Sequence, residues 1–334
     1  MTRPTHPNPA ERGTPGTTSA TGRVPGRGRF RAWAELLRVS ALFSVPGDAL
    51  AGAAAVGVRP GRGTAYAIGA SLCLYEAGMA LNDWADREED AVDRPHRPLP
   101  SGRIAPAAAL GAAGLLTAAG LALASRAGRP ALTVAAAVAG TVWAYDLRLK
   151  HTPAAPAAMA VARALDLVLG ATATATGSAP RRAPEPEPAA AGARAVLRVA
   201  APAGALALHT YAVTAVSRHE ARGGSTRAPL GALAATCALG AGTALRALRK
   251  PRGAAELVPL LPAALYAGTA AVPLLHAALD PSPPLTQRAV GAGIRAMIPL
   301  QAALAARAGA AGTGIGLLGL APLARTLARK VSAT

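Results

Sequence analysis

The chain has 334 residues, of which 51% are hydrophobic and 16% charged, and its formal net charge is +18. Aromatic residues make up only 3%, and no segment alternates basic with aromatic side chains, so the positive charge does not indicate nucleic-acid binding. The arginines gather in a tail and between apolar blocks, where membrane lipids with anionic headgroups are the expected partners.

Residues 1–30 are rich in Pro, Gly, Thr and Arg and show no apolar periodicity. Such a composition buries too little apolar surface to fold, so a disordered basic N-terminal tail is predicted. No apolar run precedes Trp33, and a secretory signal peptide is therefore not expected. Residues 31–330 form the predicted membrane domain.

Apolar segments of membrane-spanning length follow the tail. Uncharged runs separate Arg103 from Arg126, Arg198 from Arg218 and Glu256 from Asp280, each close to the ~20 residues that cross a bilayer core. Spanning helices are predicted at 33–58, 64–85, 105–125, 130–147, 153–176, 195–217, 229–248, 255–278 and 289–306. Residues 309–326 are either a tenth span or a surface-lying terminal helix. The predicted fold is an all-α polytopic transmembrane helical bundle of nine or ten spans in one domain.

The end of the second predicted span carries the most informative segment, residues 82–102, which read NDWADREEDAVDRPHRPLPSG. Asp83, Asp86 and Asp90 are spaced i, i+3 and i+7, so on a continuous helix they share one face. Carboxylates this close repel one another, and a bound cation is the usual compensation. Oxygen ligands suit Mg²⁺, whose coordination is commonly completed by substrate phosphates. The segment predicts a metal–diphosphate site at a membrane surface, with a solvated acidic helix end as the alternative.

Polar residues also mark the fifth and sixth spans. Arg163 and Asp166 lie three residues apart in an apolar run, and such groups usually pair or line a cavity. We expect either mutual neutralisation of these two or a role in the site. Residues 177–193 contain a Pro-Glu-Pro-Glu-Pro run and are predicted to form a low-complexity, solvent-exposed loop. The sixth span then ends in residues 209–224, which are too polar for a plain membrane anchor.

These motifs resemble the UbiA family of intramembrane aromatic prenyltransferases. The family's first aspartate-rich motif, NDxxDxxxD, is matched by Asn82 and the three aspartates, and its RPLPSG tail is matched by residues 97–102. A segment running from Tyr145 to Lys150, and an arginine in the fifth helix, Arg163, are also similar. The resemblance extends over about residues 33–328.

The resemblance implies a helical bundle around a central cavity that opens laterally. It also implies Mg²⁺-dependent transfer of a prenyl group from a prenyl diphosphate to an aromatic or other lipophilic acceptor. The implied metal ligands are Asp83, Asp86 and Asp90, which with Lys150 form the catalytic set. The residues implied to bind substrate are Asn82, Arg94, Arg97, Tyr145, Arg163, Asp166, Tyr211, Arg218 and Glu220.

One departure from the family concerns its second aspartate motif, which is expected after the sixth span. Glu220 is the only acid there, with Arg218 and Arg222 where acids are expected. A second function class therefore stays open: a non-catalytic protein on the same scaffold that binds or carries a prenyl lipid or pathway precursor. The Lys and Arg bias between loops predicts a multi-pass protein of the cell membrane with the aspartate motif facing the cytoplasm.

Overall fold

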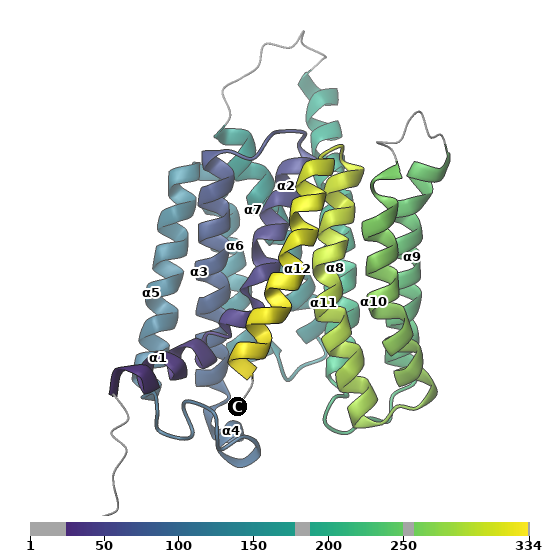
Figure 1. Cartoon of the computed structure of the whole chain (residues 1–334). Coiled ribbons are helices and arrows are strands. Elements are labelled where there is room, and N and C mark those ends of the chain that lie inside the picture. Colours follow the sequence, from purple (N-terminus) through teal and green to yellow (C-terminus); the bar gives the residue numbers. More distant parts are fainter. Residues whose placement is uncertain (1–24, 178–187, 250–256, 333–334) are drawn as a thin grey trace, which may run out of the picture.

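The computed structural model describes residues 25–177, 188–249 and 257–332, and the regular elements within these ranges are all helical (Figure 1). In chain order they are α1 (Pro25–Leu36), η1 (Val39–Ser44), α2 (Val45–Ala55), α3 (Arg62–Ala85), α4 (Arg87–Asp93), α5 (Pro106–Ala127), α6 (Arg129–Ala144), η2 (Tyr145–Leu149), α7 (Ala155–Thr176), α8 (Pro188–Ser217), α9 (Arg227–Arg249), α10 (Leu260–Leu279), α11 (Pro283–Arg307) and α12 (Ala311–Ser332). The long helices run side by side, with the short α4 at one end of the bundle.

Seven of the described helices are long and apolar enough to cross a membrane: α5, α6 with η2, α7, α8 from Arg198, α9, α10 and α11. They make the chain a polytopic helical membrane protein. α3 has 24 residues but carries Glu76 near its middle and Asn82 and Asp83 in its last turn, and it is not among the seven. Residues 42–55 and 311–320 form shorter apolar helices. The number of nine or ten spans stays a prediction.

The first predicted span, 33–58, is not one helix, and that prediction was wrong. Arg38 adopts a left-handed conformation with φ 48° and ψ 46°, which ends the helical path after α1. A 3₁₀ helix, η1, follows, and α2 then begins with Pro46 in its first turn, where proline is tolerated. Residues 25–30, predicted as part of the tail, belong to α1, and residues 1–24 lie outside the described part.

The last part of the predicted loop at 177–193 is helical, because α8 begins at Pro188. Residues 178–187 lie outside the described ranges. A proline at the first helical position followed by an alanine-rich run favours a helix start, and the sequence prediction gave the neighbouring Pro-Glu repeats too much weight.

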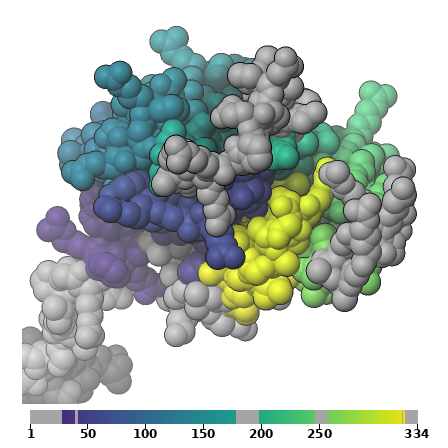
Figure 2. All heavy atoms as spheres, turned by 90° about the horizontal axis from the view of Figure 1, so that it is seen from above, coloured from purple at the N-terminus to yellow at the C-terminus, as the bar shows by residue number. Residues whose placement is uncertain are grey.

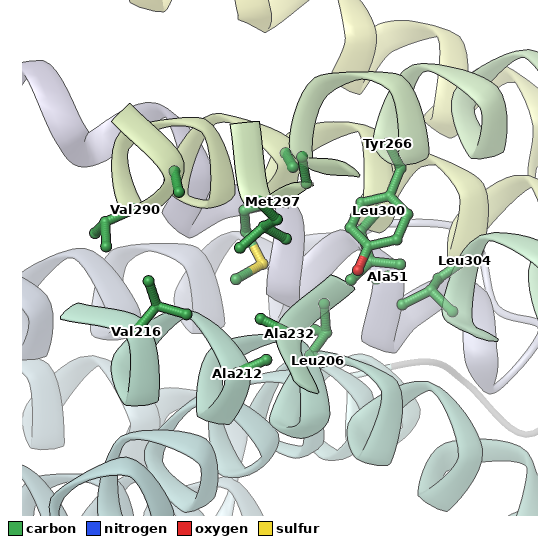
Figure 3. Packing of buried hydrophobic residues seen from close by; sticks show 14 of the residues in the cluster. Ala51, Leu206, Ala212, Val216, Ala232, Tyr266, Val290, Met297, Leu300 and Leu304 are labelled. Carbon is green, nitrogen blue, oxygen red and sulfur yellow. The ribbon is translucent and has the colours of Figure 1, made fainter. Parts of the chain in front are cut away.

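The helices after residue 198 pack around an apolar core. Figure 3 shows Leu206 of α8, Tyr266 of α10 and Leu300 of α11 close together, and each of these side chains is fully buried. His209 lies within the same layer and bonds through its ring nitrogens to the Tyr266 hydroxyl (3.1 Å) and the Gly293 carbonyl (3.1 Å). α11 is buried along most of its length and forms the centre of this half.

The helices before residue 177 pack differently. Their cluster around α3, α5, α6 and α7 consists largely of alanine, which permits close approach of backbones in a membrane bundle. Figure 2 shows the C-terminal helix α12 (yellow) from the end opposite α4, and α12 packs against η1 and α2, so the last helix closes against the first ones. The cavity described next opens within this first half.

Candidate functional site

A cavity of about 520 Å³ lies between α3, α6 with η2, and α7. α3 contributes one face, because Ser71, Tyr75, Gly78 and Asn82 recur every three or four residues. The predicted site residues that line the cavity are Asn82, Arg94, Arg97, Tyr145, Arg163, Asp166 and Glu220. One cavity therefore brings together residues from four separate stretches of the sequence.

The aspartate motif lies beside one end of this cavity, which we call the mouth. Asp83, Asp86, Asp90 and Lys150 are not among the lining residues, but Asp83 and Asp90 pair with arginines that are. α3 ends at Ala85 and α4 starts at Arg87, so Asp86 occupies the junction and the three aspartates do not lie on one continuous helix. Asp83 and Asp90, both buried, meet at one cation: Arg97 Nη1 lies 2.6 Å from an oxygen of Asp90 and 3.4 Å from an oxygen of Asp83. Two carboxylates thus converge on a single point beside the cavity.

Two more arginines neutralise this pair. Arg38 donates from Nη2 to Asp83 at 3.1 Å, and Arg94 donates from Nη1 to Asp90 at 3.4 Å. Arg38 was missed by sequence reasoning, which placed it inside a continuous span. The left-handed backbone of Arg38 ends α1 at the level of the mouth. Arg38, Arg94 and Arg97 all line the cavity.

Asp86 faces a different cation. Its carboxylate forms an ion pair with Lys150, and His151 Nε2 is 3.9 Å away. Lys150 follows a π-helical turn, η2, in which its backbone N–H donates to the carbonyl of Tyr145 at 2.9 Å. Ligand atoms of Asp86, Glu89 and His151 lie within 4.8 Å of one another, a second carboxylate-rich grouping at the mouth.

The chemistry of the donor set fits Mg²⁺. The two carboxylates that share Arg97 Nη1 place oxygens of both groups around one position that a cation already occupies. Carboxylate oxygens with an adjacent cavity for phosphate are the ligands that Mg²⁺ prefers. Asp83 and Asp90 could hold the ion at that position, and Asp86 with Glu89 and His151 is a second grouping that could do so.

Asn82 and Asp146 connect the mouth to the wall of the cavity. Asn82 Nδ2 donates to Asp146 Oδ1 at 3.0 Å, and both residues line the cavity together with Tyr145. Asp146 was not predicted as a site residue, although it stands within the Tyr145–Lys150 segment that the sequence singled out. The bond fixes the end of α3 against η2.

A second polar cluster lies at the inner end of the cavity, which we call the floor and define by Ser71, Arg163, Asp166 and Asp48. Arg163 does not pair chiefly with Asp166 as one of the sequence interpretations held; its Nη1 donates to Asp48, a fully buried residue of α2. Asp166 accepts a hydrogen bond from the Ser71 hydroxyl. Sequence reasoning missed Asp48 and Ser71, and the available signal was a lone acid in an apolar span.

Gln301 of α11 completes the support of Asp48. Its Nε2 donates to Asp48 Oδ1 at 2.7 Å and to the Ser44 carbonyl at 2.8 Å. A Cβ atom at Gly47 would lie 2.0 Å from the Gln301 side chain, so only glycine leaves room for it. Close approach of α2 to α7 has the same origin, because a Cβ at Gly170 would lie 2.3 Å from Ala49 Cα.

The end of α8 contributes less than the family pattern implies. Glu220 lines the mouth, where burial raises the pKa of its carboxyl and the positive charge of Arg94 opposes that rise. Arg218 donates to the backbone carbonyl of Thr152 and Tyr211 is 46% exposed, and neither is among the cavity-lining residues. Of the residues predicted at this end, the structure brings only Glu220 to the cavity.

A family model described as the UbiA prenyltransferase family matches residues 41–293. Digeranylgeranylglyceryl phosphate synthase of Methanopyrus kandleri is 38% identical over 129 residues, which are 37% of this chain and 46% of the relative. The bacteriochlorophyll synthase 33 kDa chain of Rhodobacter capsulatus is 65% identical over 26 residues, 8% of this chain and 9% of the relative. The matched part spans less than half of the length of these relatives.

Solved structures show the same fold. The apo structure of a UbiA homolog from Aeropyrum pernix K1 matches with a TM-score of 0.61 at 17% identity, covering 84% of this chain and 98% of that chain. A structure of digeranylgeranylglyceryl phosphate synthase matches with a TM-score of 0.56 at 16% identity. At such identities the likeness concerns the helical architecture.

Proposed function

Because the chain belongs to the UbiA prenyltransferase family, we propose that it transfers a prenyl group from a prenyl diphosphate to a lipophilic, aromatic-type acceptor within the membrane, with Mg²⁺ as cofactor. The observation that carries this proposal is the mouth of the cavity, where Asp83 and Asp90 converge on Arg97 Nη1. An acidic pair beside an arginine-lined cavity suits a metal-bound diphosphate far better than it suits an apolar lipid.

Different residues of the mouth bind the metal and the phosphate oxygens of the diphosphate. We assign Asp83, Asp86 and Asp90 to Mg²⁺, which when bound neutralises charge on the diphosphate and makes it a better leaving group. Arg94, Arg97 and Lys150 donate hydrogen bonds to the remaining phosphate oxygens, and the planar guanidinium groups can do so bidentately. Fixed donors of this kind contribute about 3–4 kcal/mol each to such reactions.

The cavity wall has a separate role. Asn82 and Asp146 fix η2 against α3, and Leu74, Val138 and Val142 form apolar walls that exclude water from the reacting carbon. The acceptor enters the same cavity, next to Tyr145. We propose further that the mouth faces the cytoplasm and that the protein resides in the cell membrane.

The test is release of diphosphate by detergent-purified protein supplied with prenyl diphosphates of several lengths and candidate acceptors, with and without Mg²⁺. We expect Mg²⁺-dependent release that Asp90→Asn lowers about hundredfold, the size of effect seen when one charge-stabilising group is removed. Asp93→Asn, the same change at an exposed residue at the end of α4, is the matched control and keeps its activity. Tight binding without release, whatever acceptor is added, contradicts catalysis and favours the carrier function.

A further inference from the structure

The floor of the cavity is as polar as its mouth, yet it lies far from it. Ser71 and Asp83 are both on α3, and a rise of 1.5 Å per residue separates them by about 18 Å. Ser71, Arg163 and Asp166 all line the cavity at this inner end. The diphosphate and the bond that breaks belong to the mouth, so these residues lie beyond the reacting carbon.

The floor holds one cationic side chain and two acidic ones. Asp48 pairs with Arg163, is 0% exposed and accepts a hydrogen bond from Gln301. Asp166 lies one helical turn from Arg163 on α7 and accepts a hydrogen bond from the Ser71 hydroxyl. Two carboxylates therefore surround one guanidinium. The other charged residues that line the cavity, Arg38, Arg94, Arg97, Asp146 and Glu220, are residues of the mouth and its neighbouring wall.

A hydrocarbon tail is a poor occupant of such a floor, because polar groups that lose water and gain no partner are destabilised. A hydroxyl or amino group fits it: the group can donate to an Asp166 oxygen and accept from a further N–H of Arg163, which has five. A carboxylate fits badly, because it would face two acidic side chains across one guanidinium that is already paired.

We propose that the floor is the subsite for the far end of the acceptor, and that it selects an uncharged hydroxyl- or amino-bearing end over a carboxylate. The acceptor is then an elongated molecule, with its nucleophilic end near the mouth and a polar, uncharged group at the opposite end. This inference rests on the proposed function, because only a prenyltransferase has an acceptor. Asp48 and Gln301 act as positioning residues, because they hold Arg163 without reaching the cavity themselves.

The experiment is a binding titration of full-length protein in nanodiscs with two matched probes. One is a dihydroxynaphthalene with hydroxyl groups at opposite ends, and the other is the same ring system with a carboxylate in place of one hydroxyl. Each titration is run with and without Mg²⁺ and a non-hydrolysable prenyl thiodiphosphate. We expect the wild type to bind the diol at least about tenfold more tightly than the carboxylate probe. The reason is that the carboxylate probe makes unfavourable like-charge contacts at the floor.

Asp48→Asn should raise the affinity for the carboxylate probe, because it leaves the positive charge of Arg163 with less compensation. A gain of affinity cannot come from a misfolded variant. Asp280→Asn, the same change at an exposed residue at the end of α10, is the matched control and leaves the ratio as in the wild type.

Three results would overturn the inference: equal or tighter binding of the carboxylate by the wild type, an unchanged ratio in Asp48→Asn, or no binding of the diol. Displacement of the diol by geranylgeranyl but not by dimethylallyl thiodiphosphate would also overturn it, because the prenyl tail would then occupy the floor. Failure of the proposed function is read separately, as absence of Mg²⁺-dependent thiodiphosphate binding, and the two probes still report on the floor in that case.

Discussion

The mouth and the floor of the cavity are both built from aspartate and arginine, but they are assembled in different ways. At the mouth, Asp83, Asp90 and Arg97 come from one stretch of fifteen positions, and within the described ranges Arg38 is the one distant residue in their ion pairs. At the floor, Ser71, Asp48, Arg163 and Gln301 come from α3, α2, α7 and α11. The mouth is a local motif that can exchange partners with a ligand, whereas the floor ties four helices together.

This difference predicts that the floor matters for stability and the mouth for chemistry. Asp48→Ala leaves Arg163 and Gln301 without their buried partner, and we expect a loss of about 3–5 kcal/mol in the free energy of unfolding. Asp90→Ala should lower it by clearly less, because Arg94 is well exposed and Arg97 is partly exposed and keeps Asp83 as a partner. The measurement is unfolding in mixed detergent micelles at increasing SDS.

A double-mutant cycle sharpens this result. If Asp48 and Arg163 stabilise mainly each other, Asp48→Ala/Arg163→Ala should be destabilised by clearly less than the sum of the two single variants. Additive effects would mean that the two side chains act through separate neighbours, and the floor would then not be one network. Equal losses for Asp48→Ala and Asp90→Ala would remove the distinction between the two ends.

The aspartate motif could be singled out from the sequence, whereas the partners at the floor could not, for a physical reason. Asp83, Asp86 and Asp90 are near neighbours along the chain, so their spacing is enough to predict that their charges interact. Arg163 and Asp166 were visible as costly groups in a span, but the sequence offered each of them only the other as a partner. Asp48 becomes the partner of Arg163 because Gly52 and Gly170 allow the backbones of α2 and α7 to come into contact. Such a contact between distant helices cannot be predicted from a local sequence pattern.

The helical fold itself followed from length and hydropathy, and the bundle was correctly predicted. The first span failed because a left-handed residue leaves no signal when it is an arginine rather than glycine. The same local event moved Arg38 from an expected helix interior to the mouth. Both misses concern backbone geometry that apolar periodicity does not encode.

A smaller effect tests whether close packing against Gly47 holds the Gln301 side chain in place beside Asp48. Gly47→Ala would place a Cβ 2.0 Å from the present position of the Gln301 side chain and displace it from Asp48. We expect a loss of about 1–3 kcal/mol in the free energy of unfolding, the usual range for overpacking. Gly111→Ala in α5 is the matched control, since nothing lies within 4 Å of the added atom and alanine favours the helix. Equal stability of the two variants would show that Gln301 can move without penalty.

The smallest expected effect separates the tyrosines that the sequence grouped together. Tyr145 lines the cavity beside Asp146, whereas Tyr211 is 46% exposed on α8 and is not among the lining residues. Tyr145→Phe removes one hydroxyl from the site, and we expect a change of about two- to tenfold in kcat/KM, the size that corresponds to one hydrogen bond. Tyr211→Phe should change kcat/KM by less than about twofold, because the hydroxyl that it loses is outside the cavity. Steady-state kinetics with one prenyl diphosphate and one acceptor compares the two. A larger effect at Tyr211 would place substrate against the outer side of α8, and the cavity between α3, α6 and α7 would no longer account for the reaction.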